Sequence, residues 1–265
     1  MSIAEAPSLD SGPAPAWRRK VAVVTGAAAG IGYSIAERLA NDGFAVALIG
    51  RTPGTAQAAA DTIVAAGGVA QGYDADVADR ERVDAAVAAI RADFGPISVV
   101  VANAAVAPQQ PFLEMTADQW NSIIDINLTG TFHTVQSCLP DLVAAGWGRV
   151  ILISSSSAQR GAPRMAHYAA SKGGQLALTK ALAVEFARTG ITVNTVVPSS
   201  IDTPSVEKKR ADGKIPPAED MAKFIPVGRM GTGADIAGAV SYLASDDTSY
   251  VTGQTISVNG GSFIG

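Results

Sequence analysis

The chain has 265 residues, of which 48% are hydrophobic and 17% are charged, and its formal net charge is −4. This composition is sufficient for a large buried core, argues against intrinsic disorder, and gives no electrostatic reason to expect nucleic acid or an anionic membrane as a partner. Cys138 is the only cysteine, which excludes an intrachain disulfide and any cysteine-cluster zinc or iron–sulfur site. We therefore expect a reducing compartment and a cytoplasmic location.

The first 17 residues read as a flexible tail. They are rich in Ala, Pro, Ser and Gly, and they carry Glu5 and Asp10 where a signal peptide would have its apolar core. Arg18-Arg19-Lys20 resembles the start of a twin-arginine export signal, but the apolar run behind it reads as a strand and has no cleavage-like site. No uninterrupted apolar run reaches the 18 or so residues that a membrane-spanning helix needs, so no membrane partner is expected.

From Val21 onward, short β-branched runs alternate with Ala-rich stretches. The runs are short, mostly apolar and bounded by turn residues, which is typical of buried strands. They predict strands at Val21–Thr25, Ala45–Ile49, Val69–Tyr73, Ser98–Ala102, Arg149–Ser154, Thr192–Val196 and Thr255–Val258.

The stretches between these strands predict helices near 31–42, 55–66, 79–93, 117–145, 167–189 and 233–245. Asp79 fits the N-cap of one helix, and Gly43 and Gly190 fit positions just after two others. Alternation of strands and helices throughout predicts an α/β fold with one doubly wound parallel sheet of about seven strands and helices on both faces.

Residues 198–226 interrupt this alternation. They contain five prolines, the charged run Glu207-Lys208-Lys209-Arg210, and little regular periodicity. A long irregular insert in a compact α/β domain is usually functional, so we expect a lid over the substrate site.

A glycine turn follows the first strand and opens the first helix, with the sequence Thr25-Gly26-Ala27-Ala28-Ala29-Gly30-Ile31-Gly32. Glycines at this position permit a tight turn and let backbone N–H groups approach a pyrophosphate at the positive end of the helix. The alternative is a tight strand–helix connection without a ligand, but the place of the turn after the first strand favours a nucleotide site.

The T-G-x-x-x-G-I-G spacing resembles the short-chain dehydrogenase/reductase family, and the resemblance extends over about residues 18–262. Asp76-Val77 matches the family's adenine contact, Asn103-Ala104 matches part of its N-N-A-G motif, and Asn127, Ser155, Tyr168 and Lys172 match its active-site set. The resemblance implies a single Rossmann-type domain over 18–265. It also implies an NAD(P)(H)-dependent oxidoreductase that interconverts a ketone and a secondary alcohol.

Two segments depart from the family pattern. The N-N-A-G segment reads Ala102-Asn103-Ala104-Ala105, so Ala105 adds a methyl where the backbone should pass close to the cofactor ribose. The family's P-G after the sixth strand is Pro198-Ser199, which puts a side chain near the expected nicotinamide. Neither change removes a catalytic group.

Tyr168 and Lys172 are four residues apart, so they share one face of a helix. A free Tyr has a pKa of roughly 10 and is a poor base near neutral pH. A nearby ammonium, together with the positive nicotinamide of an oxidised cofactor, would favour the phenolate. Tyr168 could then act as general acid/base on the carbonyl or alcohol oxygen, while Lys172 also holds the nicotinamide ribose.

The resemblance selects Ser155 from the run Ser154–Ser157 to hydrogen-bond the substrate oxygen, with Ser154 as second choice. Asn127 lies inside a helical stretch, where Asn is mildly unfavourable. It is either a helix-bending backbone contact or the holder of a water in the Lys172 proton relay, and both roles are compatible.

Other chemistries are less well supported. His133 and His167 are the only histidines, and neither belongs to a metal-ligand pattern, so no metal is expected. His167 either lines the pocket or lies on a helix surface. Ser155 lacks the G-x-S-x-G frame of a hydrolase, and Cys138 reads as a small buried hydrophobe.

Arg51 favours NADP(H) as the cofactor, with NAD(H) still open. NAD-preferring relatives carry an acid at the end of the second strand, where this chain has Gly50 followed by Arg51, which suits a 2′-phosphate. The alternative for Arg51 is stacking over adenine. The resemblance implies a cofactor site made of Gly26, Gly30, Ile31, Gly32, Arg51, Asp76, Val77, Asn103, Tyr168, Lys172, Pro198, Ile201 and Thr203.

The substrate is a small carbonyl compound or alcohol that residues 106–112, 156–160, His167 and the lid should surround. A 3-oxoacyl carrier-protein reductase and a reductase of small or cyclic ketones both fit. A non-catalytic dinucleotide-binding sensor or scaffold is the alternative, although it would not need all four active-site residues. The resemblance and the apolar C-terminal stretches 251–256 and 262–265 suggest a homotetramer, or a dimer.

Overall fold

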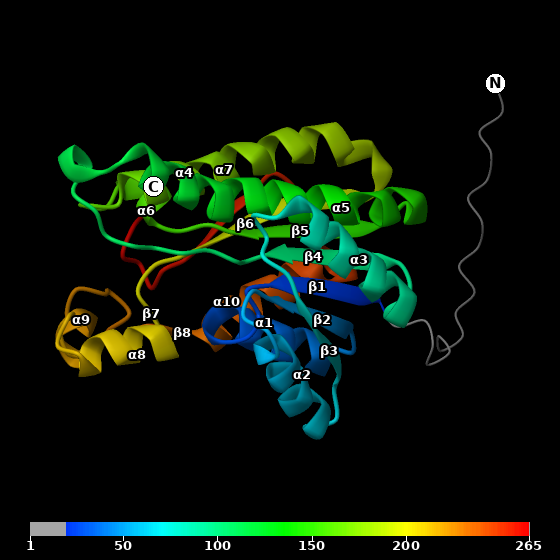
Figure 1. Cartoon of the computed structure of the whole chain (residues 1–265), viewed down its shortest axis with the longest axis horizontal. Coiled ribbons are helices and arrows are strands. Elements are labelled where there is room, and N and C mark those ends of the chain that lie inside the picture. Colours follow the sequence, from blue (N-terminus) through cyan, green and yellow to red (C-terminus); the bar gives the residue numbers. More distant parts are fainter. Residues whose placement is uncertain (1–19, 265) are drawn as a thin grey trace.

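Seven parallel strands form the central sheet of the computed structural model, which describes residues 20–264 (Figure 1). Their order is β3-β2-β1-β4-β5-β6-β9. The expected tail, residues 1–17, lies outside the described residues. All seven predicted strands are present with ends within two residues of the prediction: β1 Val21–Thr25, β2 Ala45–Gly50, β3 Val69–Asp74, β4 Ile97–Ala102, β5 Gly148–Ile153, β6 Ile191–Pro198 and β9 Thr255–Val258.

The sheet is parallel because each strand is followed by a crossover through a helix. Every residue of β1, β2, β5 and β6 is buried, as expected where helices cover both faces. The strand order reverses between β1 and β4, so the chain leaves a crevice at the carboxyl ends of these two strands. Open α/β sheets bind ligands at such a switch point.

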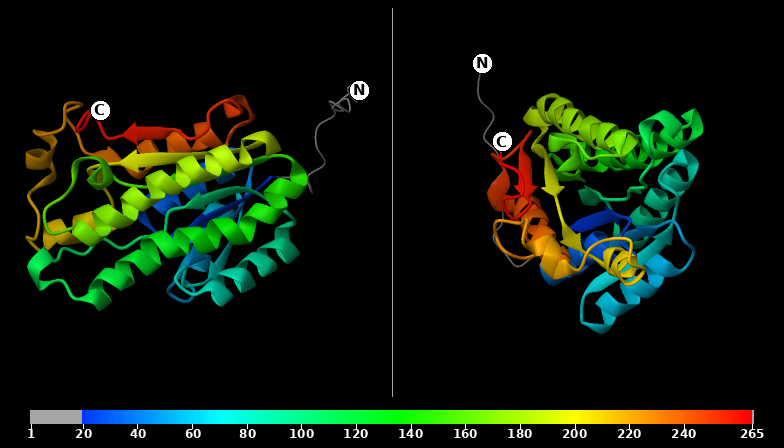
Figure 2. Two further views of the ribbon diagram at one scale, coloured as in Figure 1. Left: turned by 90° about the horizontal axis from the view of Figure 1, so that it is seen from above. Right: turned by 90° about the vertical axis from the view of Figure 1, so that its left-hand side faces the viewer.

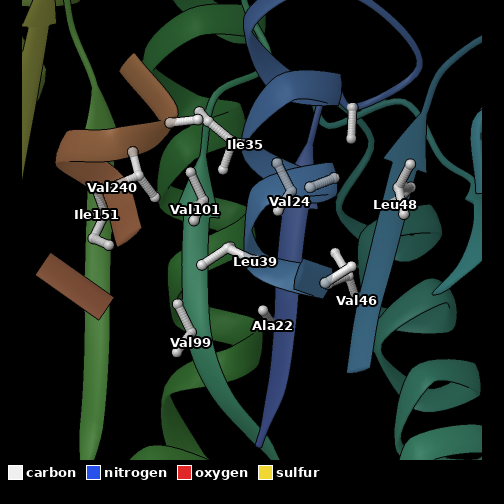
Figure 3. Close-up of a cluster of buried hydrophobic side chains, with 14 of the residues drawn as sticks. Ala22, Val24, Ile35, Leu39, Val46, Leu48, Val99, Val101, Ile151 and Val240 are labelled. Atoms are coloured by element: carbon white, nitrogen blue, oxygen red, sulfur yellow. The ribbon is translucent and has the colours of Figure 1, made fainter. Parts of the chain in front are cut away.

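Helices cover both faces of this sheet (Figures 1 and 2). Side chains such as Ile35, Leu39 and Val240 pack on one face against Val24 and Val101 (Figure 3). The second core, on the other face, contains Cys138, which is fully buried as predicted. The helices of the first face are α1 Gly30–Asn41, α2 Thr55–Ala65 and α10 Gly233–Ala244, and those of the second are α3 Arg80–Phe94, α5 Gly130–Ala145 and α7 Ala166–Phe186.

The helix-end signals behave as expected. The Asp79 side chain accepts a hydrogen bond from the backbone N–H of Arg82 and caps α3. Gly43 and Gly190 adopt φ values of 97° and 76°, the left-handed conformation that ends a helical segment.

The predicted helix 117–145 is in fact interrupted. It consists of α4 Ala117–Ile124, a π-helical turn at Asp125–Thr129, and α5. Asn127 lies in that π turn and is fully buried. Single π turns inside helices are frequent at functional sites, and the periodicity of the sequence does not reveal one.

Residues 198–226 are more regular than predicted. They contain α8 Pro204–Ala211 and α9 Ala218–Ala222, after the short strand β7 Ile201–Asp202, which pairs with β8 Gly231–Thr232. Thr203 caps α8 by accepting from the Val206 N–H, and Pro204 has the φ that a first helical position needs. Because α8 is not amphipathic, its sequence has no helical period to detect.

Figure 1 shows α8 and α9 at one end of the sheet, beside β7 and β8. Over residues 20–264, no helix is both long enough and apolar enough to cross a bilayer.

Candidate active site

The glycine turn after β1 is a cradle that larger residues could not form. Gly26 and Gly30 have φ values of 64° and 59°, and a Cβ on Gly32 would lie 2.3 Å from the Gly26 carbonyl oxygen. The α1 N-cap, Ala29, supplies no side-chain hydrogen bond, so the first N–H groups of the helix face the crevice. This arrangement fits a pyrophosphate at the positive end of a helix.

Asn103 braces this turn from the end of β4. Its Nδ2 donates to the carbonyl oxygens of Thr25 (2.9 Å) and Gly26 (3.2 Å). In return, Thr25 Oγ1 accepts from the backbone N–H groups of Asn103 (3.0 Å) and Ala104 (3.1 Å). The β1 and β4 ends are thereby tied together, so Asn103 shapes the cradle as well as lining it.

Two adjoining cavities lie along the crevice. The first, of about 330 Å³, brings the glycine turn together with the candidate catalytic residues. The second, of about 290 Å³, shares Gly26, Ala29, Ala104 and Ala105 with the first, so the two form one groove across the switch point. Of the predicted site residues, the first is lined by Gly26, Gly30, Ile31, Gly32, Asn103, Ser155, Tyr168, Lys172, Pro198 and Thr203, and the second by Gly26, Arg51, Asp76 and Val77.

Two predicted site residues lie outside both cavities. The Ile201 side chain is buried against the first core and lines a different cavity beside Ile225 and Val258. The Asn127 side chain is held by the backbone of Val106: its Oδ1 accepts from Val106 N (2.9 Å) and its Nδ2 donates to Val106 O (3.0 Å). Asn127 therefore shapes the loop after β4. It also contacts α7, because its Nδ2 donates to Ser171 Oγ (3.1 Å) and its carbonyl oxygen accepts from Gln175 Nε2 (2.9 Å).

Tyr168 and Lys172 lie one turn apart on α7, with the Lys172 Nζ 5.9 Å from the centroid of the Tyr168 ring. Lys172 is only 1% exposed. Burial lowers the pKa of Lys172 to about 7. Burial also raises the pKa of Tyr168 above its ordinary value, and a hydrogen bond with Ser155 opposes that rise. A positive charge near Tyr168, as an oxidised nicotinamide would bring, is what the site needs to favour the phenolate.

The serines that follow β5 make different hydrogen bonds. Ser154 Oγ donates to the carbonyl oxygen of Lys172 (2.9 Å), so Ser154 ties β5 to α7. Ser155 Oγ accepts from the Ser157 N–H (3.2 Å), which leaves its hydroxyl proton for an oxygen in the cavity. This geometry favours Ser155 over Ser154 as the substrate-binding serine. Ser156 Oγ donates to Ser199 Oγ (3.1 Å), so the side chain at the departure Ser199 has a partner.

Three features of the site are not visible in the motifs. Gln175, three residues after Lys172, is completely buried beside it. Its spacing is the only sequence signal, since residues three apart share a helix face. His167, for which pocket and surface positions were both open, is buried, and its Nδ1 accepts from the Tyr168 N–H. Ala105 is exposed into the groove, so its added methyl faces the cofactor side.

Comparisons with known proteins identify the family of the chain. Residues 26–262 match a family model described as enoyl-(acyl carrier protein) reductase. The 3-oxoacyl-[acyl-carrier-protein] reductase FabG of Staphylococcus aureus is 38% identical over 92% of this chain and 98% of its own length. Acetoacetyl-CoA reductase of Shinella zoogloeoides is 41% identical with the same coverages.

A solved structure has the same fold. A single-residue variant of actinorhodin polyketide ketoreductase, determined with NADPH, superposes with a TM-score of 0.89 at 32% identity, over 93% of this chain and 98% of that one. The family model, the relatives and the fold all agree with the motifs. The chain belongs to the short-chain dehydrogenase/reductase family, whose members are NAD(P)(H)-dependent oxidoreductases that interconvert ketones and alcohols.

Proposed function

We propose that the protein uses NADP(H) to interconvert a 3-oxoacyl thioester and its 3-hydroxy product. The observation that carries the proposal is a single groove in which a glycine cradle lies beside Ser155, Tyr168 and Lys172. The cradle fits a dinucleotide because a Cβ at Gly32 would fill it. When bound, the cofactor supplies or accepts the hydride, and the residues of the chain supply the rest of the chemistry.

Each catalytic side chain has a distinct role in this proposal. Tyr168 gives a proton to the carbonyl oxygen during reduction and takes it back during oxidation. Ser155 donates a hydrogen bond to the same oxygen, which favours the charge that develops there. Lys172 places a positive charge near the tyrosine and offers an N–H to the cofactor ribose. Asn127 holds the loop after β4 and presents its carbonyl oxygen to α7.

The preference for NADP(H) rests on the second cavity. Arg51 is exposed at its edge and makes no salt bridge with any carboxylate of residues 20–264, so its guanidinium is free to bind a phosphate. Thr52 and Thr55 line the same cavity with hydroxyl groups. Gly50, at the position of the acid in NAD-preferring relatives, offers no carboxylate to a ribose diol.

The substrate class rests on the relatives, two of which are named for 3-oxoacyl carrier-protein and acetoacetyl-CoA reduction. A small or cyclic ketone is the second candidate, because the ketoreductase with the same fold is a polyketide enzyme. Residues 198–226 act as the lid in this proposal: Ser199, Thr203, Pro204 and Ser205 line the first cavity from that segment.

The deciding experiment is a carbonyl panel followed at the nicotinamide absorbance with NADPH and with NADH. It should contain acetoacetyl-CoA, a 3-oxoacyl carrier protein, a cyclic ketone and an aldehyde. We expect the thioesters to give the highest kcat/KM, with NADPH preferred. Turnover of the cyclic ketone alone would reassign the substrate. Cofactor binding without turnover of any member would support the non-catalytic sensor instead.

We also propose that the protein is a homotetramer, or a dimer, in the cytoplasm. The support for assembly is exposed apolar surface near the C-terminal end: Tyr242, Tyr250 and Ile264 are all solvent-exposed. Strand β9 is one of the two edge strands of the sheet, and within residues 20–264 no further strand pairs with its outer side. The support for the location is the single, buried cysteine.

A further inference from the structure

Gln175 links the lysine of the candidate active site to the π turn that carries Asn127. Its Oε1 accepts from the Lys172 Nζ (3.2 Å), while its Nε2 donates to the Asn127 carbonyl oxygen (2.9 Å) and to Thr131 Oγ1 (2.7 Å). The side chain is 0% exposed, and both of its polar atoms have partners. A buried amide with every bond made has one defined orientation, because turning it would exchange donor and acceptor at each contact.

Gln175 also limits where the Lys172 ammonium can point. An ammonium has three N–H groups. One donates to the Ile153 carbonyl oxygen (2.7 Å) and a second to Gln175 Oε1. The third is left for the cavity that Ser155 and Tyr168 line. The Ile153 carbonyl oxygen and Gln175 Oε1 hold the first two N–H groups, and the tetrahedral geometry of the ammonium then fixes the direction of the third.

No carboxylate within the described range 20–264 forms a salt bridge with Lys172, so neutral oxygens alone stabilise its charge. The Ile153 contact belongs to the backbone, so among the side chains that the structure describes only Gln175 accepts from the ammonium. On α7 the other ionisable groups are Tyr168, the buried His167, and the exposed Lys180 and Glu185 further along the helix. The exposed Asp118 lies on α4 and the exposed Asp125 in the π turn, and α5 carries His133, bonded to Val77 O, Cys138 and Asp141. Strand β5 carries Arg149, and α6 Ser157–Arg160 ends with the exposed Arg160.

We propose that Gln175 is a positioning residue of the catalytic centre, which holds the protonated Lys172 amine beside Tyr168 by bridging it to the Asn127 carbonyl and the Thr131 hydroxyl. The proposal rests on the catalytic roles proposed above for Tyr168 and Lys172. Loss of the amide oxygen removes one of the two protein acceptors of the ammonium, which disfavours its charged form. With less positive charge beside it, Tyr168 then ionises at higher pH.

Two variants test this role. Gln175→Met keeps an unbranched side chain of similar size, and Gln175→Leu removes every polar atom. The Asn127 carbonyl still accepts from Thr131 Oγ1 (2.8 Å) in both variants, so neither neighbour is left without a bond. We expect the pH profile of kcat for alcohol oxidation to move upward by about half a unit to one unit, with kcat near neutral pH down about three- to tenfold. The KM for the alcohol should change little, because Gln175 lies behind Lys172 and does not line the groove.

Thr179→Val is the matched control. Thr179 is also buried on α7, one turn further on. Its hydroxyl donates to the backbone carbonyl of Gln175 (2.9 Å) and bonds the hydroxyl of Thr195, and it makes no hydrogen bond with Lys172. This variant should lose thermal stability and keep the pH profile of the wild type. Such a result separates loss of a buried hydrogen bond from a change at the active site.

The proposal is overturned if the Met variant folds and keeps the wild-type pH profile, or if Thr179→Val shifts the profile as much. An unfolded Met variant would also overturn it, since Gln175 would then serve packing alone. Failure of the underlying site assignment is visible separately: in that case Tyr168→Phe retains turnover whatever the Gln175 variants do.

Discussion

The Nζ of Lys172 donates a 2.7 Å hydrogen bond to the carbonyl oxygen of Ile153, the last residue of β5. Ser155 follows two residues later, so the strand end that carries the proposed substrate-binding serine also anchors the lysine. Ser154 closes the link in the other direction by donating to the Lys172 carbonyl oxygen. The distance between β5 and α7 is thus fixed at both the side chain and the backbone of Lys172. A cavity held this rigidly favours one orientation of the substrate oxygen.

Replacing Tyr168 by Phe should lower kcat by at least about 100-fold, the usual effect of losing a general acid/base. Cofactor affinity should stay close to that of the wild type, because the phenol oxygen is the only atom removed. Steady-state kinetics and fluorescence titration with NADPH measure the two effects. Tyr73→Phe is the control, since Tyr73 is also buried and its hydroxyl donates to Asp93 on α3, outside both cavities of the groove. Turnover within about threefold of the wild type in the Tyr168 variant would contradict the assigned role.

The buried lysine makes the stability of the cofactor-free protein depend on pH. The folded-state pKa of Lys172 is about 7, against an ordinary value of 10.5, so the folded state releases this proton more readily than the unfolded state. The contribution of Lys172 to stability is therefore greatest above pH 10.5 and falls as the pH drops to about 7. We expect Lys172→Met to raise the Tm by several degrees at pH 6, relative to wild type, and by less at pH 9.

Thermal unfolding of both proteins without cofactor, at pH 6, 7.5 and 9, checks this expectation. Lys180→Met is the matched control, because Lys180 lies on the same helix and is exposed. A Tm difference between wild type and Lys172→Met that does not change with pH would show that folding does not lower the pKa of Lys172.

The sheet was predicted well because strands of a parallel sheet appear in the sequence as short apolar, β-branched runs bounded by turn residues. Val21–Thr25, which is buried throughout, was predicted to the residue. The edge strand Thr255–Val258, which is only partly buried, was also predicted to the residue, because its β-branched residues lie between turn residues. The π turn around Asn127 could not be predicted, since it adds a single extra residue per turn without changing the apolar pattern. Helix α8 was missed because its charged sequence has no apolar face, so its capping residues decide its conformation.

For the candidate site, the sequence predicted which residues lie near one another, but it did not predict how every side chain is oriented. Motif spacing correctly predicted that Tyr168, Lys172, Ser155 and the glycine turn share one groove. Each of them lies at the end of a strand or on a helix that faces the groove. Spacing does not say which way a side chain points once packing is complete, so Ile201 was assigned to the cofactor while its side chain lies in a different cavity. Gln175 was missed because a lone glutamine in an Ala-rich helix belongs to no motif.

Assembly can be tested by light scattering at micromolar concentration. We expect a mass near four times the chain mass of 26.9 kDa, or twice that mass for a dimer. Replacing Tyr250 and Ile264 together by Ser should shift the equilibrium toward smaller species, since both side chains are exposed and apolar. Val64→Ser, an exposed apolar residue on α2, is the control. A mass of one chain for the wild type would reject assembly.

Cofactor preference should depend on Arg51. A charged hydrogen bond to a 2′-phosphate is worth roughly 1.5–3 kcal/mol, so Arg51→Ala should lower kcat/KM for NADPH by about ten- to a hundredfold. NADH lacks that phosphate, and its kcat/KM should change little. Arg82→Ala is the control, because Arg82 is exposed on α3 and its ion pair among the described residues is with Asp79. Steady-state kinetics with both cofactors measure the ratio.

Gly50→Asp should act in the opposite direction, because a carboxylate repels the phosphate and accepts from a free ribose diol. The new Cβ would lie 3.1 Å from the Ala56 Cβ, so α2 has to move by a few tenths of an ångström and some stability is lost. NADH use relative to NADPH should nevertheless rise, and the ratio of the two kcat/KM values is independent of how much protein is folded. Equal losses for both cofactors in Arg51→Ala would mean that Arg51 stacks on adenine without binding a phosphate. The proposed preference for NADP(H) would then lose its basis in this groove.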